Sequence, residues 1–319
     1  MIGPDLDFPQ KKQTGTGPLV SVVLATYEPD LDLVGQSLQS VANQTYDNVE
    51  LVIIDSSGEE WLRTLARDHD WVEYQFQEPS GLPAAWNAGI EAASGKYVGF
   101  LADDDYYAPE KLEQQVERLK EGVDIVYTDE YVIDEDGSVT YLSSLPVENQ
   151  ECHYIDFFRV GHGIPHLTVV GRTTCFEDVP FDEDLEVRED PHLWVRLFRR
   201  CSVARINDAL AYKRRRDDST TSNPDMMYEN ERREIDLLCQ EFPQLREYRT
   251  ERERMAKYRY GKQLFHAGRF GEARRVLLDV VQQDPSDYRA IATLGASLLP
   301  AKNKAAFQLL ERWQERLTN

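Results

Sequence analysis

The 319-residue chain lacks several features that mark large classes of protein. No apolar stretch approaches the roughly 18 residues that a membrane-spanning helix needs, and no signal-peptide pattern is present. Cysteine is scarce, and no two cysteines form a Cys-x-x-Cys pair: the four are Cys152, Cys175, Cys201 and Cys239. Scattered cysteines favour reduced thiols over a disulfide framework. The sequence therefore predicts a cytoplasmic protein without a spanning helix.

Positive charge is scarce as well. The formal net charge at pH 7 is -21 and the pI is about 4.7, and the basic residues are mostly arginine, with few lysines. Proteins that bind nucleic acid normally carry a basic surface, so this balance argues against a nucleic-acid partner. An acidic, lysine-poor composition favours a halophilic protein over an ordinary acidic one, because high salt screens the repulsion between like charges.

Apolar strands alternate with amphipathic helices through the first hundred residues. The predicted strands are 19–25, 49–54, 72–76 and 97–101. Strands that alternate with helices predict a parallel, doubly wound sheet, whose ligands bind beyond the carboxyl ends of the strands. Thr26, Asp55 and the loop 103–105 each follow one of these strands. We therefore expect them at one edge of the sheet.

Three consecutive carboxylates follow the predicted strand 97–101 and precede a helix that is expected to begin near Pro109. These residues are Asp103, Asp104 and Asp105. In so acidic a chain a solvated turn is the alternative interpretation. The position after a buried strand favours instead a divalent cation and the phosphates that it holds, because such cations prefer oxygen ligands.

Seven short blocks occur in a characteristic order along the first two thirds of the chain. They lie at 20–29, 40–55, 85–90, 100–105, 164–166, 181–183 and 189–197, and include Ala-Trp-Asn-Ala-Gly-Ile, Phe-Leu-Ala-Asp-Asp-Asp and Glu-Asp-Pro-His-Leu-Trp. Through these blocks residues 19 to about 224 resemble an inverting family 2 glycosyltransferase with the GT-A fold. The resemblance implies an α/β domain with a mostly parallel sheet. It also implies transfer of a sugar from a nucleotide-sugar donor, with uridine as the expected base, to a hydroxyl acceptor.

The resemblance further implies a set of donor-binding residues. They are Thr26, Tyr27, Glu28, Asp55, Asn87, Asp103, Asp104, Arg214 and Arg215. Thr26, Glu28 and Asp55 are expected to face the base and ribose, with Asp55 accepting a hydrogen bond from the base. The arginine that commonly precedes Asn87 is Trp86 here, which removes a candidate phosphate contact. The basic run 212–216 is expected to clamp the diphosphate, with a solvated loop as the alternative.

A metal ion is implied by the same resemblance. Asp103 and Asp105 match the metal-binding pair, with Asp104 as a substitute ligand, and the usual ion is Mg²⁺ or Mn²⁺. Ala102 replaces an acidic residue that is common in the family. The ion would stabilise the negative charge that grows on the departing nucleoside diphosphate.

Asp190 matches the catalytic base of the family, which takes the proton from the acceptor hydroxyl. An acidic residue at the start of a helix can also simply complement the helix dipole, but the surrounding blocks favour the base. The residues expected on the acceptor side are His166, Glu189 and Trp194. His166 is alternatively a packed core histidine. The four histidines between 153 and 192 match no compact zinc motif.

The chain becomes strongly charged and helical after residue 228. Small and apolar residues between Gly261 and Pro285 resemble a tetratricopeptide repeat, and Gly295 follows Gly261 by the repeat period of 34 residues. Two such units are usually too few to fold alone. We therefore expect this segment to pack against the transferase domain or a partner, with a plain helical hairpin as the alternative.

Four segments are thus predicted: an N-terminal tail (1–18), the GT-A domain (19–224), a helical linker (225–254) and a helical segment (255–319). Members of the family often use lipid-linked or growing glycan acceptors, so peripheral association at the inner membrane face, through the C-terminal helices or a partner, is compatible with the sequence.

Two other functions stay open. A nucleotidyltransferase would need a basic, glycine-rich loop after the first strand, and a non-catalytic adaptor would not need Asp190.

Overall fold

The computed structural model describes residues 8–11, 17–143, 154–161, 163–216 and 223–298. The chain divides into two compact units. Unit 1 comprises Met1–Phe157 and His162–Ser219, and unit 2 comprises Phe158–Gly161 and Thr220–Asn319. The segment boundaries predicted at 18, 224 and 254 stay predictions.

Unit 1 is built on a nine-stranded sheet in the order β3-β2-β1-β4-β8-β6-β9-β5, with β7 paired to β6. The strands are β1 (Val20–Thr26), β2 (Val49–Asp55), β3 (Val72–Phe76), β4 (Tyr97–Ala102), β5 (Tyr106–Tyr107), β6 (Ile125–Ile133), β7 (Val139–Ser143), β8 (Val169–Arg172) and β9 (Val203–Arg214). Strands β1 to β4 are parallel to their neighbours within this group. Beyond β4 the sheet is mixed, because β8 is antiparallel to both β4 and β6, and β5 is antiparallel to β9. The four strands predicted from the sequence are confirmed.

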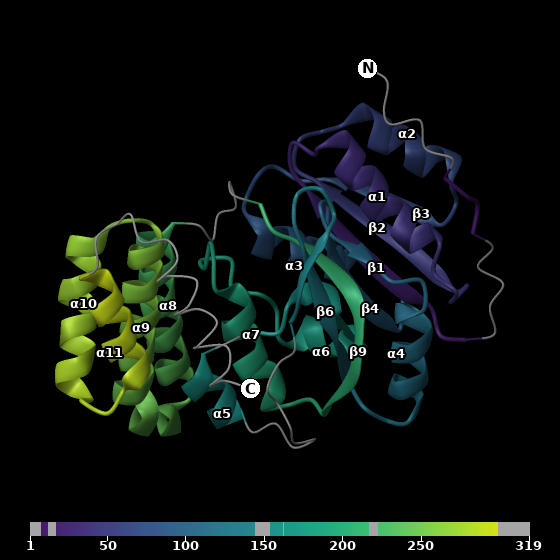
Figure 1. Ribbon diagram of the computed structural model, residues 1–319. Coiled ribbons are helices and arrows are strands. Elements are labelled where there is room, and N and C mark those ends of the chain that lie inside the picture. The colour runs from purple at the N-terminus through teal and green to yellow at the C-terminus, as the bar shows by residue number, and fades with distance from the viewer. Residues whose placement is uncertain (1–7, 12–16, 144–153, 162, 217–222, 299–319) are drawn as a thin grey trace. The chain divides into compact units, whose positions relative to one another are not determined.

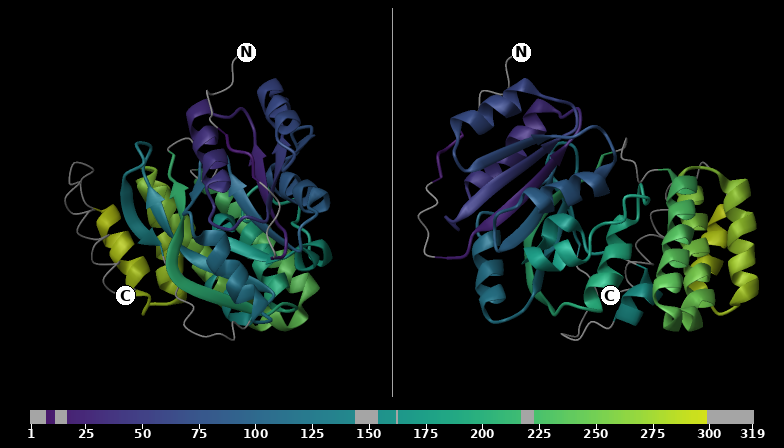
Figure 2. Two further views of the ribbon diagram at one scale, coloured as in Figure 1. Left: turned by 90° about the vertical axis from the view of Figure 1, so that its right-hand side faces the viewer. Right: turned by 180° about the vertical axis from the view of Figure 1, so that it is seen from behind.

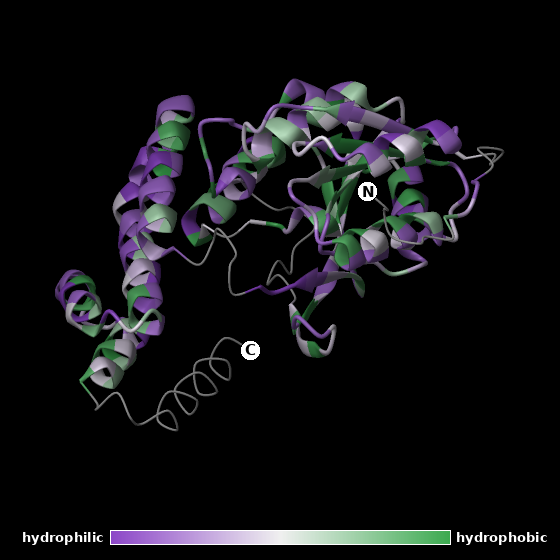
Figure 3. Ribbon diagram, turned by 90° about the horizontal axis from the view of Figure 1, so that it is seen from above, coloured by the Kyte–Doolittle hydropathy of each residue, from purple (hydrophilic) through white to green (hydrophobic). Residues whose placement is uncertain are grey.

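Helices cover both faces of this sheet (Figure 1, Figure 2). They are α1 (Leu31–Ala42), α2 (Glu60–Asp68), α3 (Leu82–Ala92), α4 (Lys111–Lys120), α6 (Thr173–Asp178) and α7 (Glu189–Phe198), and α5 (Tyr154–Val160) contributes to both units. On one face Leu24 of β1 belongs to a buried cluster with Leu38 of α1 and Leu112 of α4. On the other face Phe100 of β4 contacts Trp86 of α3, with ring centroids 5.4 Å apart. Hydrophobic residues gather in the strands between these layers (Figure 3), as two-sided burial requires.

Unit 2 consists of helices. They are α8 (Pro224–Glu241), a 3₁₀ turn (Pro243–Tyr248), α9 (Arg249–His266), α10 (Phe270–Gln283) and α11 (Tyr288–Ser297). The core includes Leu264, Leu277, Val280 and Ala290. The predicted helical segment is therefore present, and α9 runs through the predicted boundary at 254 without a break. The repeat assignment stays a prediction, because its second unit extends into residues outside the described part.

A buried ion network joins α8 and α9 within unit 2. The fully buried Arg252 forms ion pairs with Glu231 and Glu234, the latter with 3.2 Å between Nη2 and Oε1. Arg259, seven residues later on α9, also donates to Glu231, with 3.0 Å between Nε and Oε1. A Cβ at Gly161 would overlap the Arg252 guanidinium, so glycine allows the close approach.

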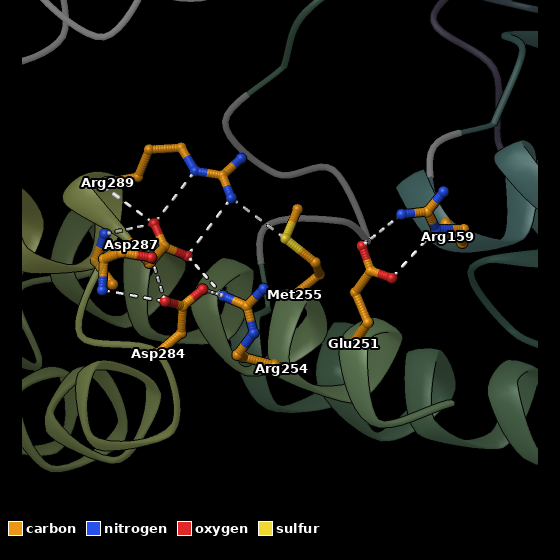
Figure 4. A network of polar contacts seen from close by, with 9 residues as sticks. Arg159, Glu251, Arg254, Met255, Asp284, Asp287 and Arg289 are labelled. Atoms are coloured by element: carbon orange, nitrogen blue, oxygen red, sulfur yellow. Dashed lines mark hydrogen bonds and ion pairs between the residues drawn. The ribbon is translucent and has the colours of Figure 1, made fainter. Parts of the chain in front are cut away.

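A more exposed network ties α9 to the start of α11 (Figure 4). Arg254 Nη1 lies 2.8 Å from Asp284 Oδ2 and 3.1 Å from Asp287 Oδ2. Arg289 shares Asp287, with 3.3 Å between Nε and Oδ1. Asp287 also accepts hydrogen bonds from the backbone at the start of α11, so these arginines stabilise a residue that caps the helix.

No helix in the described ranges is long and apolar enough to cross a membrane. Cys175, Cys201 and Cys239 are free thiols, while Cys152 lies outside the described residues.

Replacement of Arg252 by alanine should destabilise the helical unit by about 3–5 kcal/mol, because Glu231 and Glu234 would lose a buried partner. Arg249, also on α9, is the matched control: its pairs with Asp236 and Glu253 are solvent-exposed, so Arg249→Ala should change stability by less than about 1 kcal/mol. Urea unfolding followed by helical circular dichroism measures both. Equal effects of the two substitutions would contradict this interpretation of the buried network.

Candidate functional site

Strands β1, β2 and β4 bring their carboxyl ends to one edge of the sheet. Thr26 is aligned with Asp55 in the parallel pairing of β1 and β2. The Thr26 hydroxyl donates a 2.6 Å hydrogen bond to Asp103 Oδ2, in the loop that follows β4. The predicted placement of these three side chains at one edge is therefore confirmed, and the positions agree with the usual ligand site of such sheets.

Asp55 is fully buried, and its carboxylate organises the loop into α2. Oδ1 accepts hydrogen bonds from the backbone N–H and the hydroxyl of Ser57, at 2.8 and 2.9 Å. Oδ2 accepts from the backbone N–H of Glu59 at 2.6 Å and from the Tyr74 hydroxyl at 2.9 Å. A nucleotide base would have to share an oxygen that already has two donors. The role of Asp55 toward the base stays a prediction.

The surface around Asp55 combines aromatic rings with a guanidinium group. Tyr27 is 57% exposed, and Glu28 adopts a left-handed backbone conformation (φ 48°) in which its N–H donates to Ser57 Oγ at 3.1 Å. Arg63 lies 5.4 Å from the ring centre of Tyr74 and 5.9 Å from that of Phe76. A planar base can stack on such groups. Tyr27 and Glu28 are site residues predicted from the sequence, whereas Arg63 and Phe76 are not.

The three carboxylates after β4 have different environments. Asp103 and Asp104 are half-buried, whereas Asp105 is buried and its Oδ1 accepts a 2.7 Å hydrogen bond from the backbone N–H of Arg214. Burial raises the pKa of Asp103 to about 6 and raises the pKa of Asp104. The pKa of Asp105 is raised well above its usual range by burial and by the charge of Asp104. Burial and the nearby like charge thus disfavour the charged forms of these carboxyls.

This loop suits a divalent cation that a substrate helps to hold. Among the described residues, no group of three or more histidine, cysteine or acidic side chains is arranged to hold a metal ion. Asp103 is directed toward β1 and Asp105 toward β9. Mg²⁺ is often bound by one or two carboxylates together with substrate phosphates, so a complete protein cage is not required. Mg²⁺ or Mn²⁺ with a diphosphate fits these oxygen donors.

Arg214 is buried, and its guanidinium holds neighbouring loops. Nη1 donates to the carbonyl oxygens of Asp134 and Glu135, at 3.0 and 2.9 Å. Nη2 donates to Gln36 Oε1 at 2.8 Å and Nε donates to the Asp104 carbonyl at 3.1 Å. These contacts give Arg214 a use different from the diphosphate clamp that the resemblance implies. Its neighbour Arg215 is exposed.

Lys213, which lies in the basic run but was not singled out from the sequence, connects the two sides of the site. Desolvation lowers its pKa, but the charges of Glu130, Asp105 and Asp190 outweigh this effect and leave the pKa above its usual value. The ammonium group is therefore within the field of a carboxylate from the β4 loop and of one from α7. Lys213 and Glu130 are the two residues of this region that sequence reasoning missed.

Asp190 lies in the first turn of α7, after Arg188 in a left-handed conformation (φ 73°). Its carboxylate is packed against the backbone of Gly163, where a Cβ would overlap Oδ2. Burial and the charge of Asp190 raise the pKa of the neighbouring Glu189 to about 8. The packing at Gly163 and the turn at Arg188 together fix the position of Asp190.

Other predicted site residues are engaged within the protein. Asn87 joins α3 to the 181–183 segment, since Nδ2 donates to the Phe181 carbonyl at 3.0 Å and Oδ1 accepts from the Phe181 N–H at 2.9 Å. Trp194 is fully buried, and its Nε1 donates to the Ile164 carbonyl at 2.7 Å. These residues shape the frame around Asp190. Their expected contacts with substrate stay predictions.

His166 packs among aromatic rings, 5.8 Å from Trp86 and 5.2 Å from Phe181 between ring centres. Burial lowers the pKa of His166 to about 3, with a contribution from the charge of Lys213, so the imidazole is neutral at pH 7. Its Nε2 is buried without a hydrogen-bond partner in the described part of the chain. Both predicted interpretations, a core histidine and an acceptor-side residue, remain compatible with this environment.

The sheet topology and the ligand edge define a GT-A fold of the nucleotide-diphospho-sugar transferase type. The solved structure of residues 1–349 of S. aureus TarS shares this fold, with a TM-score of 0.60 and 19% identity over 86% of this chain and 83% of that chain. Residues 21–177 match the model of glycosyl transferase family 2, and this part of the chain is a family 2 glycosyltransferase domain. The predicted family and fold are thus confirmed.

Curated relatives from bacteria and archaea agree with this assignment. An uncharacterized glycosyltransferase of Rickettsia prowazekii is 28% identical over 218 residues, which are 66% of this chain and 68% of the relative. An uncharacterized glycosyltransferase of Methanocaldococcus jannaschii is 27% identical over 188 residues, 56% of this chain and 64% of the relative.

Gly163→Ala should displace the Asp190 carboxylate. If Asp190 is the base that the resemblance implies, glycosyl transfer should fall by about 100-fold, because catalytic groups misplaced by about 1 Å lose that much activity. Nucleotide binding should be retained. Gly271→Ala is the matched control, since a Cβ at Gly271 meets no atom within 4 Å in the described part of the chain. A Gly163→Ala protein with the normal transfer rate would show that the close packing at Asp190 is not needed.

Proposed function

We propose that this protein transfers a sugar from a nucleotide-sugar donor to a hydroxyl acceptor, with inversion at the anomeric carbon. The observation that carries the proposal is the position of Lys213, in the field of both Asp105 on the donor edge and Asp190 on α7. A transferase needs its diphosphate site and its base close to one reacting carbon, and the action of both carboxylates on one lysine supports this proposal. The family 2 glycosyltransferase domain supports the same activity.

The donor is proposed to be UDP-linked. S. aureus TarS has been solved with UDP and with UDP-GlcNAc, and it has the same fold. Tyr27, Glu28 and Asp55, at the ends of β1 and β2, are proposed to meet the base and ribose. Lys213 and Arg215 are the cations of the basic run proposed to meet the diphosphate, because the guanidinium of Arg214 is engaged by carbonyl oxygens and Gln36.

Asp103 and Asp105, with Asp104 as a substitute, are the residues proposed to hold Mg²⁺ or Mn²⁺. When bound, the ion would neutralise charge on the leaving diphosphate. Asp190 accepts the proton of the acceptor hydroxyl. At the same time the oxygen of that hydroxyl attacks the anomeric carbon from the side opposite the diphosphate. The bond to the nucleoside diphosphate breaks in the same displacement, which inverts the configuration. Positioning matters more than basicity here, since a carboxylate is a weak base at neutral pH.

The acceptor is proposed to be a hydroxyl group of a glycan, either lipid-linked or growing. Peripheral association of a cytoplasmic protein with the inner membrane face, through unit 2 or a protein partner, remains a proposal from the sequence. So does adaptation to high salt, and activity should therefore be assayed both in high and in low salt.

Thermal stability in the presence of nucleotides is the direct test of the proposed donor. UDP and UDP-GlcNAc with Mn²⁺ or Mg²⁺ should raise the melting temperature, and the shift should shrink when EDTA removes the ion. A folded protein that no nucleoside diphosphate or nucleotide sugar stabilises would favour the non-catalytic adaptor. Stabilisation by a nucleoside triphosphate alone would favour a nucleotidyltransferase.

Asp190→Asn should abolish most transfer, by about 10²–10⁴-fold, because the amide cannot accept the acceptor proton. Affinity for UDP and Mn²⁺ should be unchanged, since the substitution preserves the shape of the side chain. Product formation from radiolabelled donor and isothermal titration calorimetry with UDP separate the two effects. A nearly normal rate would remove Asp190 from the proposed mechanism.

Asp105→Asn should weaken UDP binding in the presence of Mn²⁺ by about tenfold or more, equivalent to about 1.4 kcal/mol. The amide oxygen can still accept the backbone N–H of Arg214, so the loop should keep its conformation while losing the charge. Asp136→Asn, in the exposed turn after β6, controls for a simple change in net charge. Unchanged affinity in Asp105→Asn would assign metal binding to Asp103 and Asp104 instead.

A further inference from the structure

Glu130 is a buried acid in the middle of β6 that the proposed mechanism does not use. Only 4% of its surface is exposed, and its Oε2 has no hydrogen-bond partner in the described part of the chain. An unpartnered carboxylate oxygen is costly inside a protein, so stability alone does not account for the residue. A hydroxyl group of a bound ligand would supply the hydrogen bond that Oε2 lacks.

Strand pairing places Glu130 on the same face of the sheet as Lys213. Glu130 is aligned with Ala211 of β9 and Val132 is aligned with Lys213, so the alternation of side chains directs Glu130 and Lys213 to one side. On its other flank Glu130 is aligned with Ser143 of β7. Glu130 is thus fixed between two strands rather than carried on a mobile loop.

The negative charge of Asp190 also acts on Glu130. Burial is the largest cause of the raised pKa of Glu130, Lys213 and Ser143 lower it, and the charge of Asp190 raises it further. Glu189, next to Asp190, also has a raised pKa, at about 8. Glu130 and Glu189 are thus two buried carboxyls that both experience the negative charge of Asp190.

We propose that Glu130 is an acceptor-recognition residue whose Oε2 accepts a hydrogen bond from a second hydroxyl of the acceptor, beside the hydroxyl that Asp190 deprotonates. The acceptor is accordingly a neutral, hydroxyl-rich glycan end rather than one that carries phosphate or carboxylate near the reacting oxygen. This assignment rests on the proposed transferase function and names its acceptor class.

The charges around Lys213 support a neutral acceptor. An anionic acceptor would be attracted to Lys213, but Glu130, Asp105 and Asp190 already offset that ammonium. A further negative group beside Glu130 and Asp190 would be repelled at short range by both carboxylates. Neighbouring hydroxyls of a sugar can instead donate to both carboxylates without adding charge.

Glu130→Gln and Glu130→Ala test the assignment. With UDP-GlcNAc, Mn²⁺ and octyl β-glucoside as probes, both variants should raise the acceptor KM about tenfold or more, the effect of about one lost charge-assisted hydrogen bond. The kcat should change less, and the Kd for UDP with Mn²⁺ should stay unchanged. Glu135→Gln, in the exposed turn after β6, is the matched control for loss of one negative charge.

Acceptor binding is measured directly by NMR titration of the protein loaded with UDP and Mg²⁺, so the result does not depend on turnover. Octyl β-glucoside should bind the wild-type protein at least tenfold more tightly than octyl β-glucuronide or glucose 6-phosphate, and Glu130→Ala should reduce this preference. Tighter binding of either anionic probe to the wild-type protein would overturn the assignment. So would an unchanged acceptor KM in both variants, or a loss of UDP affinity in Glu130→Gln, which would show that Glu130 acts through Lys213 on the donor.

The experiments distinguish failure of the transferase proposal from failure of the Glu130 assignment. If the wild-type protein binds no nucleotide sugar in the presence of a divalent ion, the transferase proposal and this assignment are overturned together. If it binds UDP-GlcNAc but prefers an anionic acceptor, the donor site stands and only the role of Glu130 is overturned.

Discussion

The charge balance around Lys213 is the constraint on which the site depends. Strand β4 ends in a loop that contains the buried carboxylate of Asp105, and α7 brings the carboxylate of Asp190 within range of the same lysine. Without a cation near them, these like charges would repel one another. Lys213 and a bound divalent ion therefore complement each other: one is permanent, and the other would arrive with the diphosphate that it binds.

The first half of the sheet was predictable because its strands are continuous apolar runs with local connections. Strands β1, β2 and β4 begin and end within one residue of the predicted bounds. The second half is set by antiparallel pairings between distant segments, such as β4 with β8 and β5 with β9, which sequence periodicity does not specify. These antiparallel pairs make the second half of the sheet mixed rather than parallel.

The site was predictable to the level of the motif, but not always to the level of the residue. In the basic run at the end of β9, composition alone gives no indication of which side chain faces the substrate, because strand residues alternate between faces. The alternation assigns Lys213 to the face of Glu130 and leaves Arg214 to hold the loops behind it. Asp55 and Asn87 show a related limit: a motif identifies the residue, whereas its hydrogen bonds within the protein become visible only in the fold.

The buried Arg252 of unit 2 fixes how α9 aligns with α8. Arg252 and Arg259 lie about two turns apart on α9, and both bind Glu231 of α8. A slide of α9 by one turn, about 5.4 Å, would separate Arg252 from at least one of its two acidic partners and leave that buried charge uncompensated. Apolar contacts between helices tolerate such slippage more easily, since one leucine can replace another. The ion pairs thus select one registry of α9 against α8, and salt that weakens surface charges would leave this selection largely intact.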